Sequence, residues 1–245
     1  MYFSLNKIVE SLPKSKNKKS SFWVKILIRR VSFLFTWLFI NLGFSSNTVS
    51  YLSIFVALSG CITLSIDNLI TQIIGVVLIN LWLVFDCVDG NIARVKKISS
   101  PIGSLIDALS GYFMVAFVFL SIGIAAFNTN GIIFQEHSVY LVIIGAVASI
   151  ADALARLIHQ KYNFTMHLIG VVKPADEAPS KISWLRERID KELGISGAFM
   201  PLLILALITQ SFDLLVIFYG LFNVSSLVAT FTYYAISAEK YNKLN

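Results

Sequence analysis

The sequence is poor in charged residues, cysteine and histidine for a chain of 245 residues. Charged residues make up 14% of it, whereas a soluble domain carries about a quarter. Its two cysteines, Cys61 and Cys87, provide no readable disulfide framework. The chain is 56% apolar, and its mean hydropathy is +0.75. These values exclude an ordinary soluble domain and indicate an integral membrane protein.

Six apolar stretches are long enough to cross a hydrocarbon core of about 30 Å. We expect spans at residues 49–66, 69–90, 102–126, 137–158, 195–210 and 212–236. The predicted fold class is therefore an all-α integral membrane protein with six transmembrane helices. The polar connection at residues 159–194 is predicted to contain a short amphipathic helix at 183–193.

The basic residues predict the orientation of these helices. All 20 Lys and Arg residues fall at 1–30, 94–97, 156–191 and 240–243. Lys and Arg are enriched in cytoplasmic loops, so both termini and the 94–97 loop are expected on the cytoplasmic side of a cytoplasmic (inner) membrane. Because this placement accounts for the net charge of +6, we predict the lipid bilayer and not nucleic acid as a partner.

Residues 22–44 are apolar, but three basic side chains interrupt their first half. The uncharged part, 31–44, is short for a span and is typical of an amphipathic helix in the head-group region. A seventh span is the alternative, and it would place residues 1–30 outside, against the charge rule.

The chain is therefore divided into a basic cytoplasmic segment at 1–21 and a membrane domain at 22–245. The basic segment contains a run of four lysines, Lys14, Lys16, Lys18 and Lys19. Such a run is typical of attraction to anionic lipid head groups, at about 1 kcal/mol per charge.

One spaced pattern of polar residues lies at the edge of the apolar stretches. It reads D-x2-D-G-x2-A-R-x8-G-x3-D and consists of Asp86, Asp89, Gly90, Ala93, Arg94, Gly103 and Asp107. Acidic side chains beside apolar membrane segments cost free energy unless they bind something, so their presence here indicates a functional site. Asp86 and Asp89 share a helix face because they are three residues apart, and Asp107 lies in the next helix. Three carboxylates favour Mg²⁺ or Mn²⁺.

The glycines and the arginine of the pattern indicate a phosphate ligand. Gly90 and Gly103 remove side-chain bulk where a ligand could approach, and Arg94 offers a planar fork to a phosphate. Together with a metal, they suit a substrate with two linked phosphates. The alternative interpretation is helix capping plus a topology signal.

This run resembles the sequence signature of the CDP-alcohol phosphatidyltransferase family, D-x2-D-G-x2-A-R-x8-G-x3-D-x3-D, at seven of its eight fixed positions. Residues 42–47, Leu-Gly-Phe-Ser-Ser-Asn, are similar to the family's L-G-[IV]-[TS]-P-N sequence before the first span, with Ser46 in place of proline. The expected order of an interfacial helix followed by six spans is also similar to that of the family, so the resemblance covers most of the chain.

The resemblance implies an enzyme that displaces CMP from a CDP-linked alcohol, such as CDP-diacylglycerol, in phospholipid or lipid-linked glycopolymer synthesis. The metal ligands would be Asp86, Asp89 and Asp107. The substrate-binding residues would be Asn47, Gly90, Ala93, Arg94 and Gly103, with Gly90 and Ala93 leaving room for cytidine. A homodimer formed through membrane helices is also implied.

The eighth position of the family pattern is an acid that completes the second metal site and deprotonates the acceptor, and here it is Gly111. Three accounts stay open. A neighbour such as Ser110 or Tyr112 substitutes, although neither is a good base at neutral pH. The acceptor is itself anionic and needs no base. Or the chain binds nucleotide and lipid without turnover.

The fourth span carries a second group of polar residues, Asp152, Arg156 and His159, which share one helix face. One interpretation is an ion pair that closes the bundle at the cytoplasmic edge. The other is a wall of the acceptor site, with Arg156 binding an anionic group. His159 and His167 are weak candidates for the missing base.

The main functional hypothesis is thus a membrane phosphotransferase whose active site faces the cytoplasm. A non-catalytic relative that binds CDP-lipid or a membrane partner is the alternative. A small transporter is disfavoured because the acids lie at a helix end, whereas secondary transporters bind near the bilayer midplane.

Overall fold

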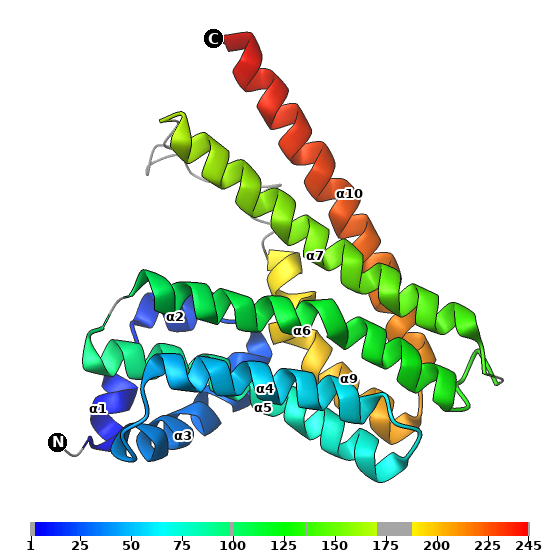
Figure 1. Ribbon diagram of the computed structural model, residues 1–245, viewed down its shortest axis with the longest axis horizontal. Helices are drawn as coiled ribbons and strands as arrows, with labels where there is room; N and C mark the ends of the chain where they lie inside the picture. The colour runs from blue at the N-terminus through cyan, green and yellow to red at the C-terminus, as the bar shows by residue number, and fades with distance from the viewer. Residues whose placement is uncertain (1–2, 99, 136, 171–187, 245) are drawn as a thin grey trace.

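The computed structural model describes residues 3–98, 100–135, 137–170 and 188–244, and this part of the chain contains helices and no strands (Figure 1). Four short elements come first: α1 (Leu5–Glu10), α2 (Lys14–Lys19), the π-helical turn η1 (Val24–Ile28) and α3 (Arg29–Asn41). The others are α4 (Ser46–Leu64), α5 (Leu69–Lys96), α6 (Pro101–Asn128), α7 (Val139–Leu168), the π-helical turn η2 (Ile195–Phe199), α9 (Met200–Thr209) and α10 (Phe212–Leu244).

Six helical segments within the described residues are long and apolar enough to cross a membrane. They are Ser46–Leu64, Leu69–Lys96, Pro101–Asn128, Val139–Leu168, Arg188–Thr209 and Phe212–Glu239. The prediction of an all-α protein with six transmembrane helices is confirmed.

Two helices extend well past the ends that hydropathy predicts. α5 continues from the expected end at residue 90 to Lys96, and α7 continues from 158 to Leu168. Hydropathy falls where side chains leave the hydrocarbon, but Lys, Arg and Gln are good helix formers in water. As a result, every motif residue from Asp86 to Arg94 lies on one continuous helix.

The fifth span is interrupted near its N-terminal end. Residues 188–193 are helical, and the chain then passes through η2 before α9 begins. Gly197 has non-helical backbone angles of φ −106° and ψ −119°. Pro201 lies in the first turn of α9, where proline is tolerated because its missing N–H has no helical partner to bind. Of the helix expected at 183–193, residues 183–187 lie outside the described residues.

Small residues allow the central helices to pack closely. α4, α5 and α6 run side by side, and α7 crosses onto α6 and α10 (Figure 1). A Cβ added to Gly75 would lie 2.5 Å from the backbone nitrogen of Leu64, and one on Gly145 would lie 2.4 Å from the carbonyl oxygen of Phe119. Such close backbone approach is typical of helix packing in membranes.

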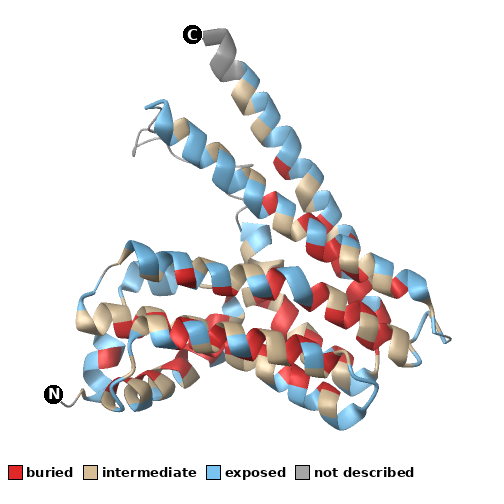
Figure 2. Ribbon diagram, in the orientation of Figure 1, coloured by how far each residue is buried: buried red, intermediate tan, exposed pale blue. Residues whose placement is uncertain are grey.

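The outer surface differs from that of a soluble protein. Buried residues gather where α4, α5 and α6 meet (Figure 2), and most of those in the described structure are apolar. Large apolar side chains lie outside, among them Phe55, Ile70, Tyr140, Ile208 and Leu221. So large an exposed apolar surface is unfavourable in water and agrees with six helices that are apolar enough to cross a membrane.

The stretch at 22–44 forms η1 followed by the 13-residue helix α3. At 1.5 Å per residue, α3 is too short to cross a core of about 30 Å. One face of it is buried, including Ser32, Thr36 and Ile40, and packs along α5, whereas Leu34 and Leu38 are exposed. This two-sided helix agrees with the expected amphipathic segment. Its position in the head-group region stays a prediction.

The arrangement leads to a topology test. The connection between α6 and α7 lies at the end of the bundle opposite to α1 and α2 (Figure 1). A reporter inserted at Asn130 in that connection is expected outside, and one fused after Asn245 is expected in the cytoplasm, because the basic residues lie on the other side. Reporter activity in intact cells measures both sites, and a cytoplasmic Asn130 would contradict the orientation.

Candidate functional site

The acidic motif lies on a helical hairpin formed by α5 and α6. Lys97 ends α5 in the left-handed conformation (φ 54°), and the N–H of Ile98 donates to the carbonyl of Ala93 at 2.9 Å. Ser100 is the N-cap residue of α6, and its side chain accepts a hydrogen bond from the N–H of Gly103. α6 then runs back along the bundle (Figure 1). The x8 spacing of the motif therefore brings its second half back beside its first half.

Asp89 and Asp107 line one cavity of about 200 Å³, which we call the carboxylate chamber. Its wall also contains Asn47, Gly90, Ala93 and Gly103, with serines from α4 and α6. The chamber thus collects six of the residues predicted for the site, two as metal ligands and four as substrate-binding residues.

Two serines at the start of α4 hold Asp89 in place. The Ser50 hydroxyl donates to Asp89 Oδ2 at 2.6 Å, and the Ser46 hydroxyl donates to the Asp89 carbonyl at 2.9 Å. Asp89 is only 4% exposed. A buried carboxylate whose hydrogen-bond donors are neutral keeps a large desolvation cost. It is therefore suited to bind a cation.

Gly103 and Asn47 meet in the same wall. A Cβ added to Gly103 would lie 2.9 Å from Asn47 Oδ1, so a larger residue would displace this amide. Glycine suits residue 103 because the Asn47 side chain lies close to it, and not because the backbone there is strained.

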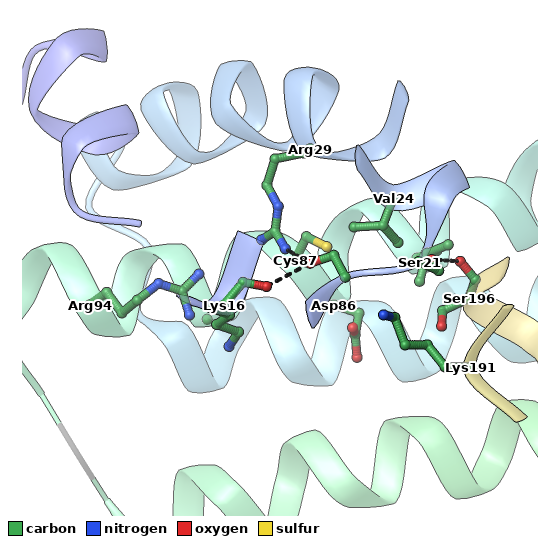
Figure 3. Close-up of a pocket in the computed structure, with 12 residues that line it drawn as sticks. Lys16, Ser21, Val24, Arg29, Asp86, Cys87, Arg94, Lys191 and Ser196 are labelled. Atoms are coloured by element: carbon green, nitrogen blue, oxygen red, sulfur yellow. Dashed lines mark hydrogen bonds between the residues drawn. The ribbon is translucent and has the colours of Figure 1, made fainter. Parts of the chain in front are cut away.

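A second cavity, of about 210 Å³, lies on the other side of Gly90 and is called here the cation chamber. Its charged lining consists of Lys16, Arg29, Asp86, Arg94 and Lys191. Figure 3 shows Lys16, Arg29 and Arg94 on one side of Asp86 and Lys191 on the other. Gly90 borders both chambers, so no side chain stands between them at that residue.

Arg94 lies over Gly90 and is positioned by α3. A Cβ on Gly90 would lie 3.2 Å from an Arg94 guanidinium nitrogen. Arg94 donates to Asn91 Oδ1 at 2.5 Å, and the Asn91 amide donates to Thr36 Oγ1 at 3.0 Å. These contacts use only part of the guanidinium, which carries five N–H groups.

The three motif carboxylates fit a divalent cation by their chemistry. They are close enough to repel one another, and no ion pair within 4.0 Å neutralises any of them among the described residues. Oxygen ligands suit Mg²⁺ or Mn²⁺. However, the part of the chain that the structure describes contains no group of three acidic, His or Cys side chains gathered as for one ion. Asp86 lines one chamber, and Asp89 and Asp107 line the other.

The structure leaves open space at Gly111. A Cβ built there meets no atom within 4 Å. The neighbouring Ser110 is buried, shares a hydrogen bond of 2.6 Å with Ser53 and accepts one of 2.9 Å from Trp82 Nε1. These contacts disfavour Ser110 as a replacement for the missing acid.

The polar group on α7 does not line either chamber. Asp152 and Arg156 form the expected ion pair at 2.9 Å, with the Arg156 side chain 44% exposed. His159 shares a hydrogen bond with Tyr234 of α10 and another with Asn163. His167 is exposed near the end of α7. The structure therefore does not bring these residues to the motif.

The N-terminal segment contributes residues to the cation chamber, although no pattern in the sequence predicts this. Ser21 donates to the carbonyl of Ser196, and the N–H of Phe22 donates to Glu192 Oε2 at 3.0 Å. These contacts join segments about 170 residues apart, and no local sequence signal indicates them. They place Lys16 at the cation chamber, where partial desolvation and the charges of Arg94 and Arg29 lower the pKa of its amine below the ordinary value.

Six membrane helices with an acidic site at one end of a helical hairpin define a polytopic membrane protein with a site for a charged ligand. A comparison with known protein families matches residues 44–217 to CDP-alcohol phosphatidyltransferase. The chain belongs to this family. A search of curated proteins found no match.

Proposed function

We propose that this protein is a membrane phosphotransferase that displaces CMP from a CDP-linked alcohol, such as CDP-diacylglycerol, and transfers the phosphate-alcohol unit to an acceptor. The observation that carries the proposal is the carboxylate chamber, where Asp89 and Asp107 lie beside Gly90, Ala93 and Gly103. Family membership supports the reaction class, and phospholipid or lipid-linked glycopolymer synthesis is the corresponding pathway type.

Asp89 and Asp107, with Asp86 beside them, would hold Mg²⁺ or Mn²⁺. When bound, the metal would neutralise charge on the pyrophosphate and on the departing CMP. Ser50 keeps the Asp89 carboxylate in one orientation through its hydrogen bond of 2.6 Å. A fixed carboxylate costs little reorganisation during the reaction.

The other residues of the site would bind and orient the donor. Gly90 and Ala93 leave space for the cytidine moiety along α5, and the Asn47 amide beside Gly103 offers both hydrogen-bond donors and an acceptor to it. Arg94 would bind a donor phosphate near Gly90. The acyl chains of a lipid donor would lie against the apolar outer surface of the bundle. We expect the site to face the cytoplasm, and a homodimer stays a prediction from the family resemblance.

The direct test is CMP release by the purified full-length protein. We expect release from CDP-diacylglycerol or another CDP-alcohol in the presence of Mg²⁺ or Mn²⁺ and a suitable acceptor. A panel of hydroxyl and phosphate-bearing acceptors, with the product followed by mass spectrometry, would identify the acceptor class. Samples with a chelator serve as the control. No release from any donor and acceptor pair would contradict the proposal.

A second candidate function is supported by Gly111. Without a carboxylate at this position, the chain lacks the acid that the family signature places there. It would then be a non-catalytic relative that binds CDP-lipid or a membrane partner. Metal-dependent binding of CDP-diacylglycerol without CMP release is the result that distinguishes this candidate.

A further inference from the structure

We infer that Trp82, Ser110 and Ser53 are positioning residues for the metal ligands of the carboxylate chamber. The inference rests on the proposed function, because it concerns the same metal site. These three residues, called here the indole–serine layer, line neither chamber. They act on the carboxylates through Ser50 and through the position of α6.

The indole–serine layer lies beneath the carboxylate chamber, further into the bundle. On α4, Ser53 follows Ser50 by three residues, and on α6, Ser110 follows Asp107 by three. Residues at this spacing are neighbours on one helix face. Trp82 lies in the part of α5 that precedes the acidic motif. The layer therefore joins all three helices that supply the chamber.

A continuous chain of hydrogen bonds runs from this layer to the chamber. Trp82 Nε1 donates to Ser110 Oγ at 2.9 Å, and the hydroxyls of Ser110 and Ser53 share a hydrogen bond of 2.6 Å. The Ser53 hydroxyl donates to the carbonyl of Ser50 at 2.7 Å. Ser50 in turn donates through its own hydroxyl to Asp89 Oδ2. The chain thus passes from α5 to α6, then to α4, and back to α5.

The hydrogen bonds of this chain have one direction. An indole N–H can only donate, and each serine hydroxyl has one proton to give. Because Ser53 gives its proton to the Ser50 carbonyl, the proton between the two hydroxyls comes from Ser110. Every donor of the layer is then used once, and the chain ends at the Asp89 carboxylate. Such a satisfied buried network holds its members in one arrangement.

The layer also determines where the second carboxylate lies. Ser53 and Ser110 are buried, so water does not compete for the hydrogen bond that joins α4 to α6. Asp107 is exposed, and Gly111 adds no acid to α6. The place of the Asp107 carboxylate relative to Asp89 therefore depends on how α6 is held against α4. Hydrogen bonds between polar side chains are a usual means of fixing helices in a membrane.

The test measures Mn²⁺ binding by the full-length protein in detergent, followed by the loss of the electron paramagnetic resonance signal of free Mn²⁺. Saturable binding is expected for the wild type. Ser110→Ala should weaken it by about tenfold, since residues that orient metal ligands typically contribute about 10- to 100-fold to metal affinity. Ser121→Ala is the matched control. Ser121 is a buried serine of the same helix that donates to the Val118 carbonyl at 2.8 Å and lines neither chamber, so its replacement should leave Mn²⁺ affinity unchanged.

A double variant separates positioning from a contribution to stability alone. Ser110→Ala leaves the Trp82 N–H buried without an acceptor, so the melting temperature should fall. Replacing both partners, in Trp82→Phe with Ser110→Ala, removes this unpaired donor and should recover part of the melting temperature. The Mn²⁺ affinity should stay low in the double variant, because Ser53 still lacks its partner on α6. Recovery of affinity together with stability would overturn the positioning role, and so would unchanged affinity in both variants.

A kinetic measurement separates this inference from the proposed function. The Mg²⁺ concentration for half-maximal CMP release should rise about tenfold in the double variant, while release at saturating Mg²⁺ should stay close to that of the wild type. If the variants weaken Mn²⁺ binding but the wild type releases no CMP, the proposed function fails and the positioning role stands. CMP release by the wild type with equal Mn²⁺ affinity in all variants has the opposite meaning. A wild type that binds no Mn²⁺ would overturn the positioning role as well.

Discussion

Replacing Asp89 with asparagine is expected to lower CMP release by about 10²- to 10³-fold, the usual cost of removing one group that stabilises transition-state charge. Asparagine has nearly the same shape, and its oxygen can still accept the hydrogen bond from Ser50. The variant therefore removes the charge and little else. Since a neutral amide binds a divalent cation weakly compared with a carboxylate, metal-dependent binding of the CDP-alcohol should also be lost.

Asp67→Asn is the matched control for this experiment. Asp67 is an exposed acid in the turn between α4 and α5, so its replacement removes the same charge outside both chambers. It should leave CMP release and donor binding unchanged. Calorimetry with a CDP-alcohol and Mg²⁺ measures the binding step without turnover. Undiminished, metal-dependent binding in Asp89→Asn would show that the carboxylate chamber is not the metal site.

The six spans and the motif could be predicted from the sequence because both depend on local information. A span requires about 20 apolar residues in a row, and Asp86 and Asp89 share a face of α5 through helix geometry alone. The close approach of Asn47 to Gly103 is a tertiary contact, but the pattern of residues before the first span already indicated Asn47.

The cation chamber could not be predicted because its members come together only in the tertiary structure. Lys16 is in a basic run whose composition equally suits lipid attraction. Its place in the chamber depends on contacts such as that between Ser21 and Ser196, which are 175 residues apart in the chain. Arg156 and His159 were candidates because they share a helix face in the sequence. Only the tertiary structure shows that they line neither chamber.

If the protein is the proposed phosphotransferase, Gly111 would determine which kind of acceptor its site can activate. A hydroxyl nucleophile must lose a proton, and a general base contributes typically about 10²- to 10⁴-fold to such a step. An anionic phosphate oxygen has no proton to lose and would attack without a base. Ser110 is held by Ser53 and Trp82. An acceptor that attacks through its own anionic oxygen is therefore consistent with the missing acid.

Gly111→Asp should raise transfer from CDP-diacylglycerol to an ordinary hydroxyl acceptor by up to about 10²- to 10⁴-fold, since it restores the base that the family signature contains. The substitution should be accepted by the fold, because a Cβ at this position meets no atom within 4 Å. Gly111→Asn is the matched control, with the same size and no charge, and it should give no gain.

The same variant should lower transfer to a phosphate-bearing acceptor that attacks through its own anionic oxygen, because the new carboxylate repels a like charge. One substitution is thus expected to raise transfer to one acceptor class and to lower transfer to the other. CMP release measured in parallel with each acceptor tests both expectations. A gain with the hydroxyl acceptor and a loss with the phosphate acceptor would identify Gly111 as an adaptation to an anionic nucleophile. If wild type and Gly111→Asp both remain folded, bind the CDP-alcohol and release no CMP with either acceptor, the missing acid is not what limits turnover. The non-catalytic role would then be the better account of this chain.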